Sequence, residues 1–355
     1  IPFCISPIIL KAFFDNRVAL FTYLISILII GFIVPNGFEF VFLQLIAGII
    51  SILTVLRMYK RVQLFISVGK IILTYILIYM AFSIIHEGSF SGIHLNMILQ
   101  FTISGVLTLF AYPFIFAFEK IFGLVSDVSL LELTDTNNPL LRRLSDEAPG
   151  TFQHSLQVAN LAEEGILLIG GNPLLVRAGA IYHDIGKLKN PIYFIENQSS
   201  NFNPHDSLTL EDSANIIINH VADGVELAQS HNLPDTLIEF IRTHHGDSTV
   251  QYFYNQFVKK FPNQDVDIES FTYPGPKPSS KETAVLMMAD ASEAAARSLI
   301  NPTVDEIDKI VEKVIDNQTN QKQFINANIT FKEITEIKKI FKEKLVNIHH
   351  ARIQY

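Results

Sequence analysis

The chain has 355 residues, a length typical of about two domains. Only 17% of the residues are charged and the mean hydropathy is +0.29, so the chain is too apolar for a purely soluble protein and too polar for one that lies wholly within a membrane. A hydrophobic content of 49% excludes a disordered chain. The single cysteine, Cys4, excludes an internal disulfide and any cysteine-clustered zinc or iron–sulfur site.

Four apolar segments in the first third of the sequence predict membrane-spanning helices. They cover residues 18–34, 40–56, 64–85 and 95–118, and Lys70 is the one charged residue within them. Each is close to the roughly 17–25 residues that a helix needs to cross the hydrocarbon core. We therefore expect residues 1–118 to form a bundle of about four spanning helices, with the lipid bilayer as its partner.

The basic residues of the loops predict the orientation of this bundle. Lys11 and Arg17 precede the first segment and residues 57–61 hold three more basic residues, whereas the other two breaks contain neither Lys nor Arg. The positive-inside rule places the basic loops in the cytoplasm, and four crossings return the chain there. Lys70 lies near the cytoplasmic end of its helix and is interpreted as snorkelling, which favours an anchor or a signal-coupling bundle over a transporter.

The remainder of the chain is acidic and helical. From residue 119 onward it has 21 Lys and Arg against 32 Asp and Glu, which argues against binding to duplex nucleic acid. Alternating β patterns are nearly absent, and Pro-rich residues 262–280 predict a loop. Helical periodicity marks residues 151–169, 174–188, 213–230, 234–245, 281–299 and 331–348. We expect an all-α chain in which residues 119–145 form a linker helix region and residues 146–355 form a helical domain.

Seven polar residues fall on or beside core-facing helix positions of this domain. A hydrogen-bonded core residue is the better interpretation of one such histidine, but a cluster shared by all seven is the more economical explanation of the set. Imidazole and carboxylate ligands without thiolate favour Mn, Fe or Zn, and seven ligands suit two ions, with one carboxylate as a bridge. The seven are His154, His183, Asp184, His220, His244, His245 and Asp290.

The ordered set of these residues resembles the HD superfamily of metal-dependent phosphohydrolases, with His183-Asp184 in the string Tyr182-His183-Asp184-Ile185-Gly186-Lys187. Residues 147–151, 196–198, 203–205, 273–278 and 350–355 further resemble the seven-transmembrane HD family, which includes cyclic di-AMP phosphodiesterases of the PgpH type. That family usually carries an extracellular N-terminal sensor domain and more spanning helices, and we expect the chain to lack this region. The resemblance implies a multi-pass protein of the bacterial inner membrane with a cytoplasmic HD domain.

The resemblance also implies the roles of individual residues. His154, His183, Asp184 and Asp290 would hold one divalent transition-metal ion, with Mn or Fe expected. His220, His244 and His245, with Asp184 as the bridge, would hold the second. A hydroxide between the ions would attack one phosphorus of cyclic di-AMP and open the ring to linear pApA.

Four further residues are candidates for catalysis or substrate binding. Lys187 is a candidate for binding a phosphate oxygen or stabilising the metal carboxylates, and its alternative is a solvated lysine at a helix end. His205, Tyr273 and Lys277 are candidates for contacts with the substrate, although His205 equally fits an Asx-type turn and Tyr273 a loop anchor. Asp247 follows His244-His245-Gly246 where the family usually has Thr, and we expect it to face solvent.

Two other classes of function stay open at this point. One is hydrolysis of a different nucleotide, such as cyclic di-GMP, (p)ppGpp or a dNTP, because metal ions contact only the phosphate. The other is a non-catalytic receptor that senses a nucleotide, which the complete ligand set disfavours. A second copy of the chain is a candidate partner in either case.

Overall fold

The structure, a computed structural model, describes residues 1–55, 62–89, 92–198 and 203–350. Within these ranges the secondary structure is helical, and the one β contact is an isolated antiparallel bridge between Thr249 and Thr272. The all-α prediction is therefore confirmed for the described residues. The chain divides into two units, residues 1–131 and 132–355, and the division falls within the segment 119–145 that we expected to be a linker.

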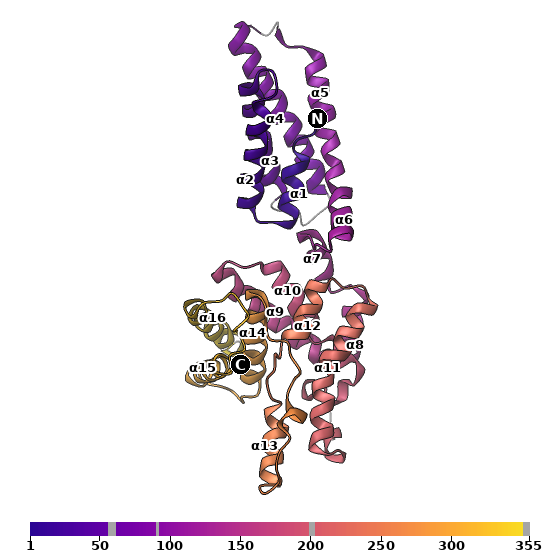
Figure 1. Cartoon of the computed structure of the whole chain (residues 1–355), viewed down its shortest axis with the longest axis vertical. Coiled ribbons are helices and arrows are strands. Elements are labelled where there is room, and N and C mark those ends of the chain that lie inside the picture. Colours follow the sequence, from indigo (N-terminus) through magenta and orange to yellow (C-terminus); the bar gives the residue numbers. More distant parts are fainter. Residues whose placement is uncertain (56–61, 90–91, 199–202, 351–355) are drawn as a thin grey trace. The chain divides into compact units, whose positions relative to one another are not determined.

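The first unit is a bundle of helices that run side by side (Figure 1). Among the described residues, three stretches are long and apolar enough to cross a membrane, namely Gly37–Thr54, Phe65–Glu87 and Leu95–Phe122. The first of the four expected spans is instead a shorter apolar helix that ends at Gly31, because residues 32–36 form a turn before the next helix begins. The helices are α1 (Ile5–Phe13), α2 (Asn16–Gly31), α3 (Gly37–Val55), α4 (Val62–Glu87), α5 (Leu95–Leu107), η2 (Thr108–Phe110), α6 (Ala111–Phe122) and α7 (Asp127–Leu133), of which α7 extends into the second unit.

The interior of this bundle holds a small polar network around Gln44. The Tyr23 hydroxyl donates to the Gln44 carbonyl at 3.0 Å, and the Tyr75 hydroxyl donates to the Gln44 side-chain oxygen at 2.8 Å. Gly48 allows the Tyr23 ring to lie against α3, since a Cβ at that position would stand 1.9 Å from the ring. Large apolar side chains such as Phe21 face outward. Satisfied polar groups inside and apolar groups outside are typical of helices that contact lipid.

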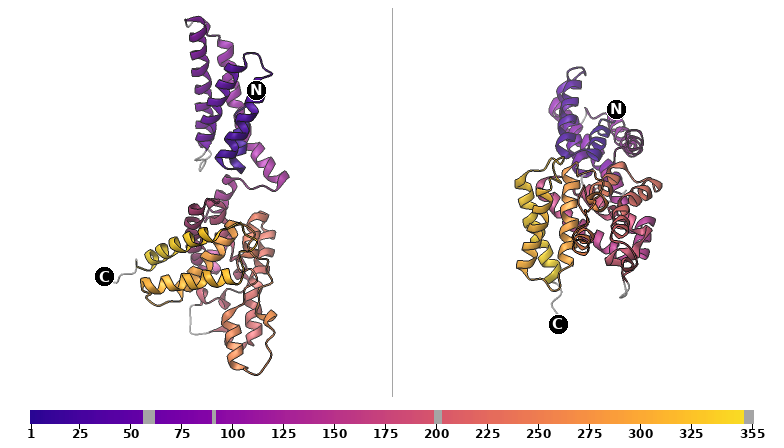
Figure 2. Two further views of the ribbon diagram at one scale, coloured as in Figure 1. Left: turned by 60° about the vertical axis from the view of Figure 1, so that its left-hand side comes forward. Right: turned by 60° about the horizontal axis from the view of Figure 1, so that its bottom comes forward.

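The second unit is built from helices and short 3₁₀ turns (Figure 2). One expected helix, residues 174–188, ends early at Tyr182, because Asp184 leaves the helical conformation with φ −107° and ψ 15° and a 3₁₀ turn follows. Helices α13 and α15 were not predicted. The elements are α8 (Pro139–Glu147), α9 (Pro149–Ile169), α10 (Pro173–Tyr182), η3 (Ile185–Lys189), η4 (Pro191–Tyr193), η5 (Ile195–Asn197), η6 (Pro204–Ser207), α11 (Leu210–Ser230), α12 (Asp235–Thr243), α13 (Gln251–Lys260), η7 (Ile268–Phe271), α14 (Lys281–Arg297), α15 (Val304–Asn320) and α16 (Phe331–His350).

Helix α9 lies at the centre of this unit and contacts α8, α10, α14 and α16. Close approach is possible at Gly165, where a Cβ would stand 2.9 Å from the ring of Phe341. Helices α15 and α16 lie side by side (Figure 2) and are joined by ion pairs of Lys338 and Lys342 with Glu312. Helix α16 of this pair therefore packs on the same central helix that carries His154, and α15 packs on α14 and α16.

A glycine contact fixes the position of the turn after α10. A Cβ on Gly186 would lie 1.9 Å from the backbone carbonyl oxygen of His220, and Gly224 lies on the same side of α11. The backbones of η3 and α11 therefore touch directly. This contact sets Asp184, two residues before Gly186, against the His220 side chain.

We expect Gly186→Ala to destabilise the second unit by about 1–3 kcal/mol, because the added methyl group must displace backbone rather than a flexible side chain. Calorimetry of the full chain in detergent measures this as a lower Tm of the soluble unit. The matched control is Lys189→Ala in the same turn, where only an exposed ion pair with Asp223 is lost and the Tm should change little. Equal Tm values for the two variants would contradict the close-contact explanation.

Candidate metal centre

The seven predicted ligands come together around the carboxylate of Asp184. The Nε2 atoms of four histidines lie near its oxygens: His183 at 3.2 Å, His220 at 3.3 Å, His244 at 3.7 Å and His154 at 3.8 Å. These side chains come from α9, α11, the end of α12 and the turn after α10, and all are buried. The fold thus brings residues that are distant in sequence into one cluster.

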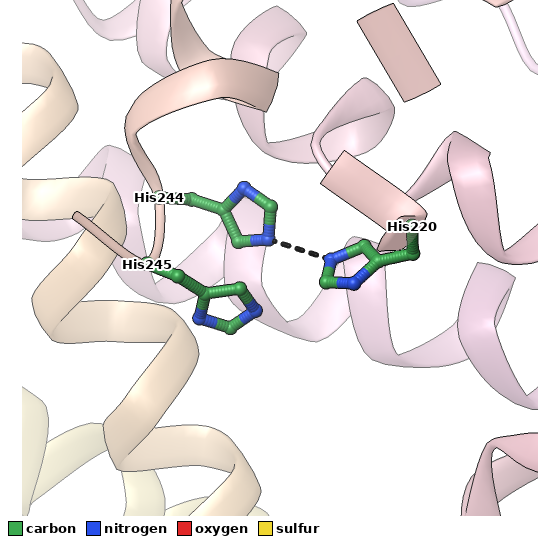
Figure 3. A group of neighbouring side chains, drawn as sticks. All are labelled: His220, His244 and His245. Carbon is green, nitrogen blue, oxygen red and sulfur yellow. Dashed lines mark hydrogen bonds between the residues drawn. The ribbon is translucent and has the colours of Figure 1, made fainter. Parts of the chain in front are cut away.

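Asp290 and His245 complete the cluster. Asp290 Oδ1 lies 2.9 Å from His154 Nε2 and 3.6 Å from His183 Nε2. The His245 ring lies 4.0 Å from the His244 ring and 5.2 Å from the His220 ring, measured between centroids (Figure 3). Three groups have all their ligand atoms within 4.8 Å of one another: His154, His183 and Asp184; His183, His244 and Asp290; and His220, His244 and His245.

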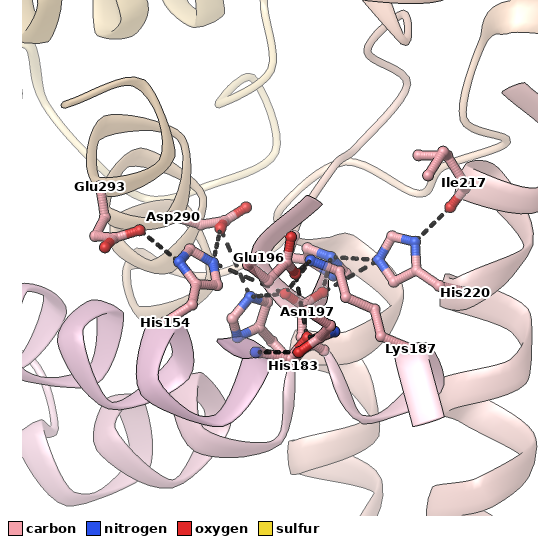
Figure 4. A network of polar contacts seen from close by, with 12 residues as sticks. His154, His183, Lys187, Glu196, Asn197, Ile217, His220, Asp290 and Glu293 are labelled. Atoms are coloured by element: carbon pink, nitrogen blue, oxygen red, sulfur yellow. Dashed lines mark hydrogen bonds and ion pairs between the residues drawn. The ribbon is translucent and has the colours of Figure 1, made fainter. Parts of the chain in front are cut away.

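The orientation of each imidazole is set by its outer nitrogen. Nδ1 of His183 donates to the Ala180 carbonyl and Nδ1 of His244 to the Ile241 carbonyl, both at 2.7 Å. His220 bonds in the same way to the carbonyl three residues earlier (Figure 4). A carbonyl oxygen only accepts, so the hydrogen is on Nδ1, and in the neutral rings the Nε2 lone pair points inward. This is the usual arrangement of metal-binding histidines.

His154 differs from the other three because its Nδ1 contacts a carboxylate instead of a carbonyl. The partner is Glu293 Oε2, and both side chains are buried. A carboxylate behind a ligating imidazole orients the ring and raises its basicity. Glu293 was not identified from the sequence, although it follows Asp290 by three residues and so shares its helix face.

Buried atoms without partners show that the cluster fits a cation. His183 Nε2 and Asp184 Oδ1 are fully buried and have no hydrogen-bond partner. The Nε2 atoms of His220 and His244 lie 3.1 Å apart, and with both Nδ1 positions protonated these are two facing lone pairs (Figure 3). Such groups are costly to bury unless a positive centre lies between them. The donor set therefore fits divalent metal ions.

The charges of the histidines differ across the cluster. Burial lowers the pKa of His154 and of His183, but contacts with Asp290 and Glu293 outweigh it and raise the pKa of His154 to about 9. Asp184 and Asp290 raise the pKa of His183 to about 10 in the same way. Burial and neighbouring imidazoles lower the pKa of His244 far below its usual value and that of His245 to about 3. Without a cation, His154 and His183 therefore carry an additional proton, and His244 and His245 do not.

Lys187 is held against the proposed bridging carboxylate. Its Nζ lies 2.7 Å from Asp184 Oδ2 and 2.8 Å from Glu196 Oε1, and its side chain is only 13% exposed. Burial lowers the pKa of Lys187, but these two carboxylates outweigh it and raise the pKa above the ordinary value. Glu196 also accepts from the Thr151 hydroxyl at 3.1 Å (Figure 4), which ties η5 to the start of α9. The solvated-lysine alternative does not match this buried position.

The three residues predicted to contact the substrate make different contacts within the second unit. His205 Nε2 donates to the Tyr193 carbonyl at 2.9 Å, and the ring of Tyr273 stacks on that of His245 with centroids 4.2 Å apart. Lys277 pairs with Asp247 at 3.2 Å. Asp247 is half exposed, close to our expectation that it faces solvent, but it is also held by this ion pair and by a bond from Gln323.

A cavity of about 720 Å³ opens beside the cluster. Its described lining includes His154, Asp184 and Asp290, but not His205, Tyr273 or Lys277. Gln198, which also lines the cavity, belongs to the segment 196–198 that resembles the family, whereas four other lining residues were not predicted from the sequence: Glu293, Arg297, Asn317 and Gln321. Seven-residue spacing puts Arg297 on the Asp290 face of α14, which is a signal in the sequence. Asn317 and Gln321 come from the region of α15, which was not predicted.

Comparisons with known proteins support this arrangement. The family described as "7TM receptor with intracellular HD hydrolase" matches residues 1–126, and the HD domain family matches residues 151–295. The protein named cyclic-di-AMP phosphodiesterase PgpH of Bacillus subtilis is 36% identical over 100% of this chain and 51% of its own length. The protein of the same name from Listeria monocytogenes is 44% identical over 67% of this chain and 33% of its own length. The chain thus spans about half or less of these relatives.

Solved structures match the second unit. The crystal structure of the L. monocytogenes PgpH HD domain has a TM-score of 0.57 and 42% identity, and covers 60% of this chain and 100% of that domain. The structure of the same domain in complex with cyclic-di-AMP has a TM-score of 0.58 and 41% identity, with 61% and 100% covered. These matches show that the chain belongs to the seven-transmembrane HD family of membrane proteins with an HD hydrolase domain.

Proposed function

We propose that this protein is a membrane-anchored phosphodiesterase that hydrolyses cyclic di-AMP to linear pApA. The observation that carries the proposal is the set of inward-facing Nε2 atoms around Asp184, with His183 Nε2 and Asp184 Oδ1 buried and without a hydrogen-bond partner. The relatives named for this activity and the solved HD domain in complex with cyclic-di-AMP support the choice of substrate. The adjacent cavity has the volume of an ordinary small-molecule site.

The residues would hold two divalent transition-metal ions, with Mn or Fe expected. We assign His154, His183, Asp184 and Asp290 to one ion, and His220, His244, His245 and Asp184 to the other. When bound, such a pair supplies a hydroxide between the ions and positive charge for the phosphoryl group. Asp184 is the natural bridge, because each of its two oxygens faces a different set of histidines.

The remaining polar residues keep this arrangement rigid. Lys187 binds Asp184 Oδ2 and so restrains rotation of the bridging carboxylate. Glu196, held by Thr151, fixes Lys187 in turn. Since one misplaced ligand lowers catalysis sharply, this buried chain of contacts supports catalysis without touching the reacting atoms. His205, Tyr273 and Lys277 stay predictions as substrate contacts.

The domain plan completes the proposal. Residues 1–118 would be a multi-pass anchor in the bacterial inner membrane, residues 119–145 a linker, and residues 146–355 a cytoplasmic HD domain. The apolar helices and the match of residues 1–126 support the anchor. The basic loops support the orientation.

A substrate panel tests the activity. The chain in detergent with Mn²⁺ is incubated with cyclic di-AMP, cyclic di-GMP, ppGpp and dATP, and the products are identified by liquid chromatography and mass spectrometry. We expect pApA from cyclic di-AMP at a rate at least about tenfold above the others. Turnover of another nucleotide alone would favour that substrate, and tight binding without turnover would favour a receptor.

The double substitution His183→Ala with Asp184→Ala tests the metal centre. We expect loss of bound metal, measured by mass spectrometry of the ions, and a fall in hydrolysis of at least about a hundredfold, because both proposed ions lose a ligand. The matched control is His231→Ala, which removes an exposed histidine of the same unit. Full turnover in the double variant would refute the site.

The raised pKa values predict that metal binding releases protons. His183, with a pKa of about 10, and His154, with a pKa of about 9, are protonated at pH 7 in the metal-free protein, and an imidazole must lose its inner proton to bind an ion. We expect metal affinity to rise with pH up to about 9–10 and to fall in acid. Titration calorimetry in buffers of different ionisation enthalpy should show release of about two protons per protein at pH 7. Binding without proton release would contradict this charge state.

A further inference from the structure

A cyclic dinucleotide carries two phosphodiesters, and in the proposed reaction the metal centre would engage the one that is cleaved. The second phosphate would then face the walls of the same cavity. Four carboxylates line that cavity, so its walls repel an anion unless a cation is available. They belong to Asp184, Glu196, Asp290 and Glu293. Lys187 also lines the cavity, but it is already shared between Asp184 and Glu196.

Arg297 is a second cation that lines this cavity. It lines the cavity at the last turn of α14, two helical turns beyond Asp290, which corresponds to a rise of about 10 Å along the same face. In the part of the chain that the structure describes, its guanidinium has no ion-pair partner, and the residue is exposed. Asn317 and Gln321, which line the same cavity, are neutral and leave the charge of Arg297 uncompensated.

We propose that Arg297 binds the phosphate that is not cleaved and thereby selects substrates with two phosphates. This inference rests on the proposed function. A guanidinium presents two parallel N–H groups that match the oxygens of a phosphate, which a lysine cannot reproduce. The ordinary role of an arginine in a last helical turn is to complement the helix dipole. That role affects stability, but it does not distinguish a substrate with two phosphates from one with a single phosphate.

The experiment compares two substrates on the full chain in detergent with Mn²⁺: cyclic di-AMP and bis(p-nitrophenyl) phosphate, which has one phosphorus. We expect Arg297→Gln to raise the KM for cyclic di-AMP about ten- to a hundredfold, because a charge-assisted contact is lost. For the single-phosphate diester, kcat/KM should stay within about twofold of the wild type, and the bound metal should be unchanged. Arg297→Lys should give an intermediate KM.

Arg142→Gln is the matched control, because Arg142 is exposed on α8 and does not line the cavity. An unchanged KM for cyclic di-AMP in Arg297→Gln, or an equal loss on both substrates, would overturn the inference while leaving the proposed function intact. A wild-type protein that cleaves only the single-phosphate diester would overturn both. Should Arg297→Gln fold poorly, Arg297→Lys decides the question, since full activity on both substrates would exclude bidentate binding.

Discussion

The second unit is organised around one buried site, where the Nε2 atoms of four histidines surround the carboxylate of Asp184. The facing Nε2 lone pairs of His220 and His244 repel one another and the nearby Asp184 Oδ1 when no positive charge lies between them. The outer nitrogens of His154, His183, His220 and His244 are each bonded to a carbonyl or a carboxylate, which holds these rings in place. Because the rings are fixed, their inner nitrogens stay directed at one point, and a cation bound there is stabilised by all of them.

The surrounding fold serves this site through helix ends and close backbone contacts. Helix α10 ends at Tyr182, so His183 and Asp184 stand at its terminus and Asp184 has a non-helical backbone. His244 likewise follows the last residue of α12. The contact of Gly186 with the His220 carbonyl then brings Asp184 and His220 together. The helices thus hold the backbone of these residues in place, and the non-helical backbone at the helix ends lets several side chains point to one site.

The sequence predicted the all-α class and the ligands that gather at the site, because a polar side chain on an apolar helix face is a strong local signal. It did not predict the break after Tyr182, since the apolar pattern continues through Ile185 and Leu188 although the backbone turns. Glu293 and Arg297 were also missed. A charged residue in a helix is ordinarily exposed, and only the packing of α14 against α9 and α15 shows that these two face the ligands and the cavity. Patterns within one helix are local, whereas the cavity is formed by elements far apart in the chain.

The two sides of the cluster are electrically unequal, and this has a consequence for any pair of ions held there. On one side, His154 is backed by Glu293 and accompanied by Asp290, so a dication there would be largely neutralised by its surroundings. On the other side, the ligands besides the shared Asp184 are the imidazoles of His220, His244 and His245, with no carboxylate of their own among them. An ion on that side would retain more of its charge and would be the stronger Lewis acid of the two. Two chemically identical ions would then behave differently, one as a structural anchor and the other as the electrophile.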